Sequence, residues 1–292
     1  MEIQTQPIEL SQKEQIERIR ELGGNKLSAN TFDSLYLWQQ QMGLSVYIDD
    51  DFFAVKCSER GQNTWFFPCG DRTKTLQFIK NKMSDKDFAL CYIDEDDAAW
   101  LEEAFPAKWE LLREEESDEY ICRIADFIGL SGGKYLGIRH KINRILRENT
   151  VKTSVITDET VADALAVVSE WDKLPHHIGN NNLVDRGVSD RALIERSRLG
   201  IDGVIVYIGE TPMAVFAGFP IDGDTVDALV GKCRHDAPGG FVYYAIHEYF
   251  KYVADKYTYC NLEEDLGIAG IRMIKEGLRP EKKNLIRTAV RR

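Results

Sequence analysis

Three consecutive strand-like segments run into a proline- and glycine-rich turn, and this order constrains the fold more than any other feature of the chain. The segments Gly203–Ile208, Met213–Pro220 and Thr225–Lys232 are joined by glycine-containing turns, which favour an antiparallel meander. The turn Pro238-Gly239-Gly240 then opens a helical segment over Phe241–Lys256. We therefore expect a sheet of sequential strands with a helix packed on it.

The remaining elements of the second half complete the order α-β-α-α-β-β-β-α-β-α-β. They are helices at Ser131–Asn149, Asp158–Trp171, Asp190–Leu199 and Ala269–Gly277, and strands at Thr153–Ile156, Tyr257–Leu262 and Asn284–Val290. The polar stretch Pro175–Arg186 is expected to be a loop. A meander followed by a Gly-rich turn, helix, strand, helix and strand is the layout of a GNAT acyltransferase.

The first half repeats a shortened version of this order, α-α-β-β-β-α-β-α-β. Its predicted helices are Ser11–Leu22, Thr31–Met42, Thr73–Met83 and Asp94–Phe105, and its predicted strands are Leu44–Ile48, Phe52–Cys57, Thr64–Phe67, Phe88–Ile93 and Trp109–Arg113. Two copies explain the length of 292 residues better than one decorated domain. The expected fold class is α+β, with two tandem GNAT-like lobes, 1–126 and 127–292, each a mostly antiparallel mixed sheet flanked by helices.

The net charge of −11 is concentrated in the first half of the chain. Residues 1–126 carry 14 Lys and Arg against 26 Asp and Glu, or −12, whereas residues 127–292 carry 23 against 22, or +1. An acidic first half argues against a general nucleic-acid coat, because phosphate binding needs a basic surface. A local basic patch on the second half stays compatible with the composition.

The spacing of the cysteines and the length of the apolar runs indicate the cellular compartment in which the protein is expected to lie. The six cysteines lie far apart without a C-x-x-C pair, which predicts reduced thiols and neither a zinc nor a redox site. The pair His176-His177 lacks a third ligand, so no metal is expected. No run of 18 apolar residues and no signal-peptide pattern occurs, which predicts a cytoplasmic protein without a transmembrane segment.

Several stretches spread over the chain form a recognisable set: Phe32–Trp38, Phe67–Gly70, Leu130–Tyr135 with Arg139–Arg144, Pro212–Phe216 with Gly218, and Asn261–Gly267 followed by Ile271-Arg272, Lys275 and Pro280. On these residues the chain resembles the DUF2156 family, whose domain also forms the C-terminal part of phosphatidylglycerol lysyltransferases and has a tandem GNAT fold akin to the Fem aminoacyltransferases. The resemblance implies the fold and an acyl or aminoacyl transfer, without fixing either substrate.

The segment Asn261-Leu-Glu-Glu-Asp-Leu-Gly267 supplies the candidate catalytic residues. If the strand continues through it, Asn261, Glu263 and Asp265 share one face because alternate residues do. Such a cluster could accept a proton from an attacking amine, which must be neutral to react. The alternative is structural: Asp265 caps the following helix and Asn261 ties down a loop.

Candidate donor-binding residues surround the glycine turn. Backbone amides of Gly239 and Gly240 at a helix start favour an anion such as a pyrophosphate or a tRNA phosphate, and Lys232 and Arg234 lie close in the sequence. The Q/R-x-x-G-x-G/A pattern of acetyl-CoA-binding GNATs is missing, and Asp236 adds an unfavourable charge. A plain turn is the alternative.

The stretch Lys134–Lys152 is the most basic part of the chain, with six Lys or Arg against one acid. An apolar stripe leaves basic side chains on the opposite helix face. Lys134, Arg139 and Arg144 are therefore candidates for contact with the backbone of an aminoacyl-tRNA. The alternative is a solvated face that balances the acidic lobe.

Arg272, Lys275 and Tyr243 are the candidates for acceptor binding. Arg272 and Lys275, at i and i+3, could bind an acidic acceptor or pair with Glu263 and Asp265, and Tyr243 could line a cleft or lie in the core. Three hypotheses follow: an aminoacyl or acyl transferase acting on a small molecule, peptide or amino sugar; a CoA-dependent N-acetyltransferase; and a non-catalytic binding module. No cofactor is required, since acyl-CoA or aminoacyl-tRNA would serve as donor substrate.

Overall fold

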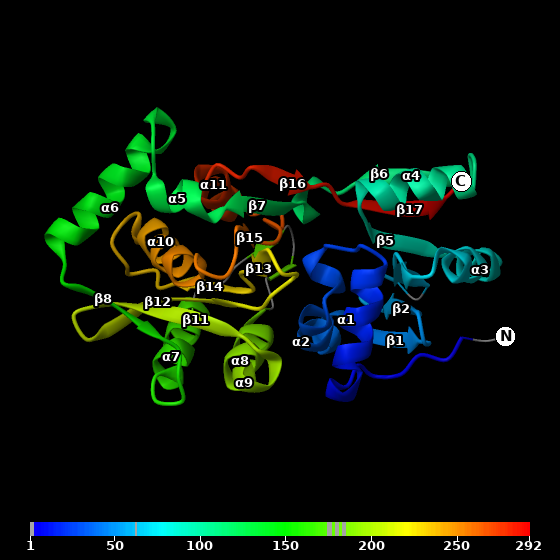
Figure 1. Cartoon of the computed structure of the whole chain (residues 1–292), viewed down its shortest axis with the longest axis horizontal. Helices are drawn as coiled ribbons and strands as arrows, with labels where there is room; N and C mark the ends of the chain where they lie inside the picture. The colour runs from blue at the N-terminus through cyan, green and yellow to red at the C-terminus, as the bar shows by residue number, and fades with distance from the viewer. Residues whose placement is uncertain (1–2, 62, 174–176, 179–180, 183–184) are drawn as a thin grey trace. The chain divides into compact units, whose positions relative to one another are not determined.

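The computed structural model describes residues 3–292 except 62, 174–176, 179–180 and 183–184 (Figure 1). The chain forms two compact units, and each unit contains β-sheet flanked by helices. Unit 1 contains the residues up to Glu119 together with Asn284–Arg292, and unit 2 contains Tyr120–Lys283. The predicted boundary near Asp126 is therefore placed a few residues too late, and the predicted assignment of the whole C-terminus to the second lobe is wrong.

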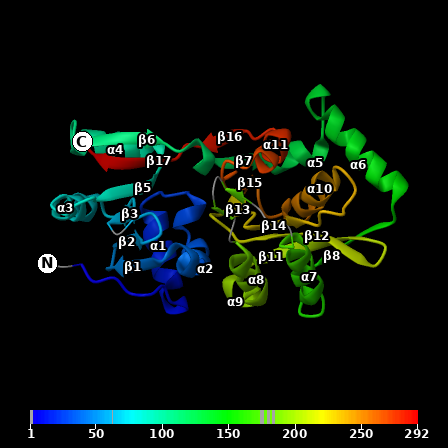
Figure 2. The same cartoon turned by 180° about the vertical axis from the view of Figure 1, so that it is seen from behind.

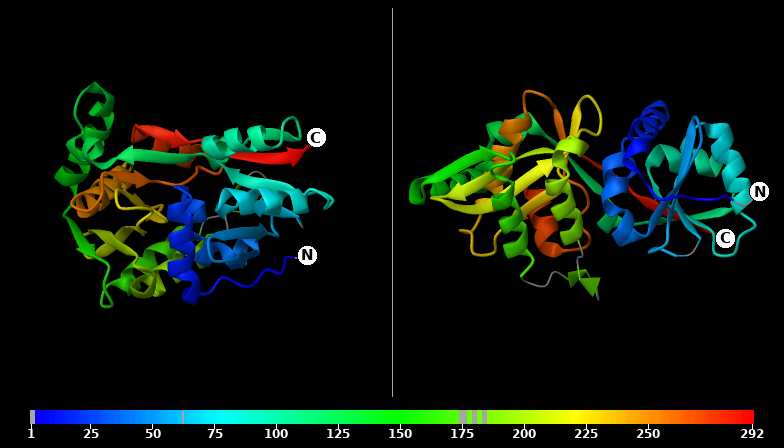
Figure 3. Two further views of the ribbon diagram at one scale, coloured as in Figure 1. Left: turned by 45° about the vertical axis from the view of Figure 1, so that its right-hand side comes forward. Right: turned by 90° about the horizontal axis from the view of Figure 1, so that it is seen from below.

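Unit 1 is built on a seven-stranded sheet with the order β1-β2-β3-β5-β17-β6, in which β4 also pairs with β2. The strands are β1 (Leu44–Ile48), β2 (Phe52–Cys57), β3 (Thr64–Phe66), β4 (Cys69–Gly70), β5 (Ala89–Ile93), β6 (Trp109–Arg113) and β17 (Arg287–Arg291). Only the β3–β5 pair among those described is parallel. The C-terminal strand β17 lies between β5 and β6, which is why the end of the chain belongs to unit 1 (Figures 1 and 3).

The α-helices described in unit 1 are α1 (Lys13–Leu22), α2 (Phe32–Met42), α3 (Arg72–Lys82) and α4 (Glu95–Ala104), with short 3₁₀ turns at Leu10–Gln12, Ser28–Asn30 and Glu115–Ser117. Three of these four α-helices, α2, α3 and α4, begin at a side-chain cap. Asp71 and Asp94 accept the third backbone N–H of α3 and α4, and Thr31 does the same for α2. The predicted start of the first helix at Ser11 falls in a 3₁₀ turn with a Glu9/Gln12 capping box, and α1 begins at Lys13.

Unit 2 contains two four-stranded sheets. One is antiparallel, with the order β14-β12-β11-β8, and the other has the order β13-β15-β7-β16. The strands are β7 (Glu119–Arg123), β8 (Val151–Val155), β11 (Asp202–Ile208), β12 (Thr211–Gly218), β13 (Thr225–Asp227), β14 (Val230–Cys233), β15 (Tyr259–Asn261) and β16 (Lys282–Asn284). A small hairpin of β9 (His177–Ile178) and β10 (Asn181–Asn182) lies where a loop is predicted; His176 is outside the described residues.

The third strand of the predicted meander is divided between the two sheets. β13 pairs in parallel with β15, whereas β14 pairs with β12. At the end of β12, a Cβ on Gly218 would lie 1.7 Å from the carbonyl oxygen of Asp227, so only glycine permits this approach. The chain therefore leaves one sheet and enters the other within the segment predicted as one strand.

Helices cover both faces of the β14-β12-β11-β8 sheet. The helices of unit 2 are α5 (Ile124–Gly129), α6 (Leu136–Glu148), α7 (Val161–Trp171), α8 (Arg186–Ile194), α9 (Arg196–Leu199), α10 (Phe241–Val253) and α11 (Ala269–Gly277), with a 3₁₀ turn at Gly133–Tyr135. Figure 2 shows α7 on one face of β11 and β12 and α10 on the other. Among the described residues, none of the helices is long and apolar enough to cross a membrane.

Candidate active site

The segment Asn261–Gly267 leaves its strand at Asn261 and turns sharply. Glu263, Leu266 and Gly267 have left-handed backbones, with φ of 57°, 55° and 71°. The buried Asn261 side chain holds the turn, since its Oδ1 accepts the backbone N–H of Glu263 at 2.8 Å. The prediction that Asn261, Glu263 and Asp265 share one strand face is therefore wrong, and Asn261 has the structural role named as its alternative.

Asp265 is buried and its carboxylate is surrounded by donors. Oδ2 accepts the Tyr120 hydroxyl at 2.5 Å and Arg272 Nε at 2.7 Å, while Oδ1 accepts Arg272 Nη2 at 2.9 Å and the backbone N–H of Gly267 at 2.8 Å. Burial by itself would raise the pKa of Asp265, but Arg272, Tyr120 and Gly267 together lower it below its ordinary value. A carboxylate held in this way is a poor proton acceptor, so the geometry favours an anchoring role over the predicted role as a base.

Glu263, like its neighbour Glu264, is a half-buried carboxylate. Its backbone is held on both sides, because its carbonyl accepts the N–H of Tyr120 at 3.3 Å in addition to the Asn261 contact. Left-handed backbone is unusual for a residue with a side chain and is retained where the surrounding structure enforces it, often at functional sites. The side chain of Glu263 is thus presented from a fixed turn next to Lys275, which feels its negative charge.

Lys275 is the second charged group of this region. Its Nζ donates to the carbonyl oxygen of Glu264 at 2.5 Å from a half-buried position on α11. Burial lowers the pKa of Lys275, although the acidic groups of Glu264, Glu263 and Asp265 oppose that shift. The structure thus brings Arg272 and Lys275 to the 261–267 segment, as predicted; Arg272 is engaged as the ion-pair partner of Asp265 rather than held ready for an acidic acceptor.

Tyr120 was not singled out from the sequence. It follows the acidic tract Glu114–Glu119 on β7, and its ring lies 4.0 Å from Lys283 Nζ and 5.9 Å from Lys275 Nζ. Burial and the Asp265 carboxylate raise its pKa, which keeps the hydroxyl protonated as a donor. No local pattern marks such a residue, because its partner Asp265 lies 145 positions away in the sequence.

The glycine turn at the start of α10 contacts α6. Gly240 has φ +89°, and a Cβ there would lie 2.9 Å from Lys141 Cδ. Arg144 Nη2 donates to the carbonyl oxygen of Gly239 at 2.5 Å. The structure therefore brings Arg144, Gly239 and Gly240 together, three of the residues predicted to bind a donor, and adds Lys141, which the sequence analysis did not single out.

Lys232 and Arg234 are engaged elsewhere. Lys232 is buried, pairs with Asp185 and lies 3.9 Å over the Trp171 ring. Arg234 makes a bidentate ion pair with Asp236, at 2.9 and 2.8 Å. Binding a phosphate would require breaking these pairs, so the predicted donor-binding role of Lys232 and Arg234 is not supported.

Arg139 also has a structural contact. It donates to the carbonyl oxygens of Leu130 and Gly132, where the chain leaves α5 through a left-handed Leu130 with φ 44°. Lys134 is exposed, 3.5 Å from Asp126. Of the two, Lys134 keeps a surface position suitable for a ligand.

The helix α6 presents a basic surface. Ile138, Ile142 and Ile145 are buried against unit 2. The exposed basic side chains of this stretch, called here the basic face, are Lys134, His140, Lys141, Arg144 and Arg147. Tyr243 on α10 lies beneath it, buried, with Lys141 Nζ 4.7 Å above its ring, and it is part of the core packing rather than an open wall.

Comparison with known proteins identifies the family of this chain and proteins of similar fold. Residues 20–286 match the family described as phosphatidylglycerol lysyltransferase, C-terminal. A conserved protein of unknown function from Bacteroides thetaiotaomicron VPI-5482 has a similar structure, with a TM-score of 0.88, 23% identity and all of both chains covered. L-PGS from Bacillus licheniformis has a TM-score of 0.68 at 15% identity, covering 100% of this chain and 94% of that one. For FemX the TM-score is 0.61 at 9% identity, covering 98% and 96%.

The family match indicates an acyltransferase, and the fold joins two α/β units in tandem. Because the family match spans most of the sequence, the chain belongs to the phosphatidylglycerol lysyltransferase C-terminal family, which confirms the predicted resemblance. No curated protein matches the sequence.

Proposed function

We propose that this chain transfers an aminoacyl group from an aminoacyl-tRNA to an amine or hydroxyl acceptor. The observation that carries the proposal is the contact between the basic face of α6 and the glycine turn of α10, through Arg144 and Gly239. A tRNA backbone needs closely spaced cations, and the basic face supplies them on a protein whose net charge is −11. The family's description, which names a lysyltransferase, supports aminoacyl transfer.

The reaction would take place at the 261–267 segment. The acceptor nitrogen or oxygen attacks the ester carbonyl carbon, a new C–N or C–O bond forms, and the ester bond to the tRNA breaks. Glu263 accepts the acceptor's proton and returns it to the leaving oxygen. Asp265 and Arg272 position the turn, and Lys275 places positive charge beside Glu263.

A charge-reversal experiment tests the proposal. The double variant Arg144→Glu/Arg147→Glu should lose binding to charged tRNA and lose transfer, because each reversed side chain adds repulsion to the phosphates. The matched control is Arg198→Glu, an exposed arginine on α9. Equal loss in the control, or full transfer by the double variant, would contradict the assignment of tRNA to this face.

The acceptor is tested by competition between classes. Purified protein with charged tRNA is given an amino sugar, a short peptide or phosphatidylglycerol vesicles, and the labelled product is measured. The class that accepts the label is the substrate class, and Glu263→Gln should lower the rate constant with little change in tRNA affinity. A Glu263→Gln protein with full activity at all pH values would remove Glu263 from the reaction.

A CoA-dependent N-acetyltransferase is the second candidate. It is favoured by the glycine turn itself, since Gly240 at φ +89° opens the long helix α10, and a helix start of this kind attracts a pyrophosphate. Acetyl-CoA should then raise the melting temperature, whereas charged tRNA should not. The reverse result supports aminoacyl transfer.

A further inference from the structure

The C-terminal end of α11 connects the 261–267 segment to the start of α6, and all of these residues belong to unit 2. On one side, Lys275 Nζ donates to the carbonyl oxygen of Glu264 at 2.5 Å. On the other side, the buried Tyr135 hydroxyl, just before α6, donates to the carbonyl oxygen of Leu278 at 3.2 Å. Because Lys275 and Leu278 are three residues apart, a single helical turn joins the two contacts.

Tyr243 of α10 provides a second connection between the same elements. Lys141 Nζ, from the basic face, lies 4.7 Å from the centre of the Tyr243 ring. A Cβ on Gly277 would lie 2.7 Å from the Tyr243 hydroxyl oxygen, so α11 approaches this tyrosine as closely as a glycine permits. The end of α11 is therefore held against α10 next to the basic face.

Arg279 comes directly after this end of α11 and is exposed. No acidic side chain pairs with Arg279 in the part of the chain that the structure describes. Burial and Asp126 raise the pKa of Tyr135 to about 12, and the positive charge of Arg279 opposes that rise. Arg279 thus places an unpaired cation beside the start of α6.

The backbone of Arg279 is left-handed, with φ 58°. Leu278 is the C-cap of α11, so Arg279 occupies the next position, where glycine is favoured because it adopts this backbone without strain. The helix dipole attracts a cation at this end, but a cation within the last turn would satisfy it without a strained backbone. Strain of this kind is retained where the side chain has a function.

A phosphate is the ligand that suits Arg279, because a guanidinium can donate two parallel hydrogen bonds to phosphate oxygens. In the proposed reaction the tRNA backbone lies on the basic face, while the 3′ end, which carries the ester, reaches the 261–267 segment. We propose that Arg279 binds a phosphate of the single-stranded 3′ end between these two surfaces. This assignment rests on the proposed function, since it takes tRNA as the donor.

Binding of two RNAs to the full chain tests the assignment. Total tRNA is compared with the same tRNA trimmed of its single-stranded 3′ end. Arg279→Gly should weaken binding of the complete tRNA about tenfold, the effect of losing one charge-assisted contact, and leave binding of the trimmed tRNA unchanged. Arg144→Glu/Arg147→Glu should weaken binding of both RNAs, because its repulsion acts on the backbone that remains after trimming.

Ala107→Gly is the matched control for backbone strain. Ala107 is an exposed, uncharged residue of unit 1 whose backbone is also left-handed, with φ 58°. Both glycine variants should melt no lower than the parent protein, because glycine relieves the strain at each position. Only Arg279→Gly should lose affinity for the complete tRNA.

Three results would overturn the assignment of Arg279: equal weakening of both RNAs by Arg279→Gly, an unchanged affinity of this variant for the complete tRNA, or the same loss in Ala107→Gly. A parent protein that binds neither RNA would overturn the proposed function as well. Binding that depends on Arg144 and Arg147 but not on Arg279 would overturn the assignment of Arg279 alone.

Discussion

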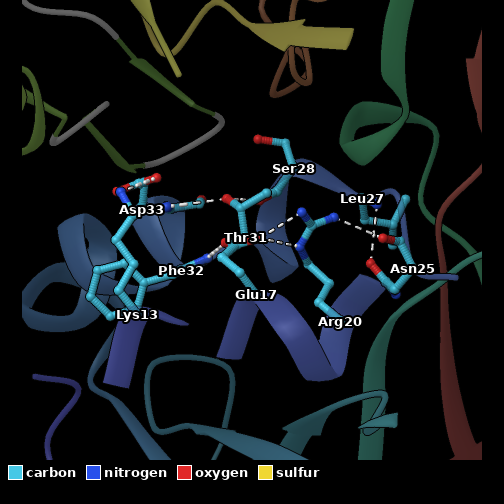
Figure 4. Close-up of polar contacts among 10 residues, drawn as sticks. Lys13, Glu17, Arg20, Asn25, Leu27, Ser28, Thr31, Phe32 and Asp33 are labelled. Atoms are coloured by element: carbon cyan, nitrogen blue, oxygen red, sulfur yellow. Dashed lines mark hydrogen bonds and ion pairs between the residues drawn. The ribbon is translucent and has the colours of Figure 1, made fainter. Parts of the chain in front are cut away.

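The pKa values of buried aspartates are shifted in opposite directions in the two units. In unit 1, Asp33 and Asp97 have pKa values raised to about 6 and about 7, because burial outweighs the pairing with Lys13 and Arg72 respectively. In unit 2, the equally buried Asp265 has a lowered pKa. The side-chain donor to Asp33 is the Lys13 ammonium (Figure 4). Lys13 Nζ lies 2.8 and 3.1 Å from the two carboxylate oxygens of Asp33.

Asp265 also has more hydrogen-bond donors than Asp97. The carboxylate of Asp265 accepts hydrogen bonds from two guanidinium nitrogens of Arg272, from the Tyr120 hydroxyl and from the backbone N–H of Gly267. The carboxylate of Asp97 accepts one, from a guanidinium nitrogen of Arg72. Several donors to the charged form lower a carboxyl pKa even where desolvation raises it. Asp265 thus stabilises unit 2 as an anion, whereas burial makes Asp97 hold its proton more tightly.

The largest expected effect is the loss of Asp265. Asp265→Ala should lower the free energy of unfolding by about 3–5 kcal/mol, because Tyr120 and Gly267 lose their acceptor and Arg272 its counter-ion. Urea unfolding measures it, with Asp126→Ala as control, since its exposed contact with Lys134 should contribute less than about 1 kcal/mol. If Asp265→Ala changes the free energy of unfolding only slightly but abolishes transfer, Asp265 has a catalytic role instead of a structural one.

The second effect is a pH dependence that unit 1 owes to Asp97. A folded pKa of about 7 lies above the unfolded value, so the native state holds the proton more tightly, and stability falls as pH rises from about 4 to about 7. The charged groups around it are Arg72, Asp94 and Asp96. We expect the titration of Asp97 to change the free energy of unfolding by about 2 kcal/mol or more over this pH range. Asp97→Asn should remove this part of the pH dependence. An unchanged slope would contradict it.

Asp265 should show the opposite sign. Its folded pKa lies below the unfolded value, so its contribution is complete above the unfolded pKa and is lost as pH falls through the folded one. Asp265→Asn should therefore flatten the acid limb of the stability curve and leave the neutral limb parallel to that of the parent protein. Acid titration of the unfolding midpoint measures this, and a steeper acid limb in the variant would refute the pairing.

A smaller effect is expected at Asp33. Lys13→Met should lower stability by about 1 kcal/mol at pH 8, where Asp33 is ionised, and by much less at pH 5, below its pKa of about 6. Lys108→Met, an exposed lysine of unit 1, is the control and should show no such pH-dependent difference. Equal losses at both pH values would mean that packing against Phe32, not charge, explains the Lys13 contribution.

The smallest stability effect belongs to the basic face. Arg147→Ala should change stability by less than about 0.5 kcal/mol, because the side chain is exposed. If it contacts a phosphate, the same change should reduce the salt dependence of tRNA binding by about one unit of slope. Loss of stability without a change in slope would assign Arg147 to the fold instead.

The sequence by itself determined the local elements and the family. The residue pattern located α2, α3 and α4 to within a residue or two. The isoleucines of the apolar stripe of α6 are buried, whereas Leu146 of the same stripe is 49% exposed. These features depend on residues close together in the sequence, because a helix is specified by its capping residue, the spacing of its apolar residues and the residue that ends it. The motif Asn261–Gly267 also identified the region where Arg272 and Lys275 gather.

The tertiary structure decided what is joined to what. It placed β17 between β5 and β6, divided the predicted third strand of the meander between two sheets, and gave Asp265 its partner Tyr120. The alternation of residues along a strand could not predict the turn at Glu263, because that turn depends on backbone hydrogen bonds to β7. Tyr120 of β7 donates its N–H to the carbonyl oxygen of Glu263 and accepts the N–H of Leu262. Periodicity records which face of a segment is buried, but the choice of partner depends on contacts between residues far apart in the chain.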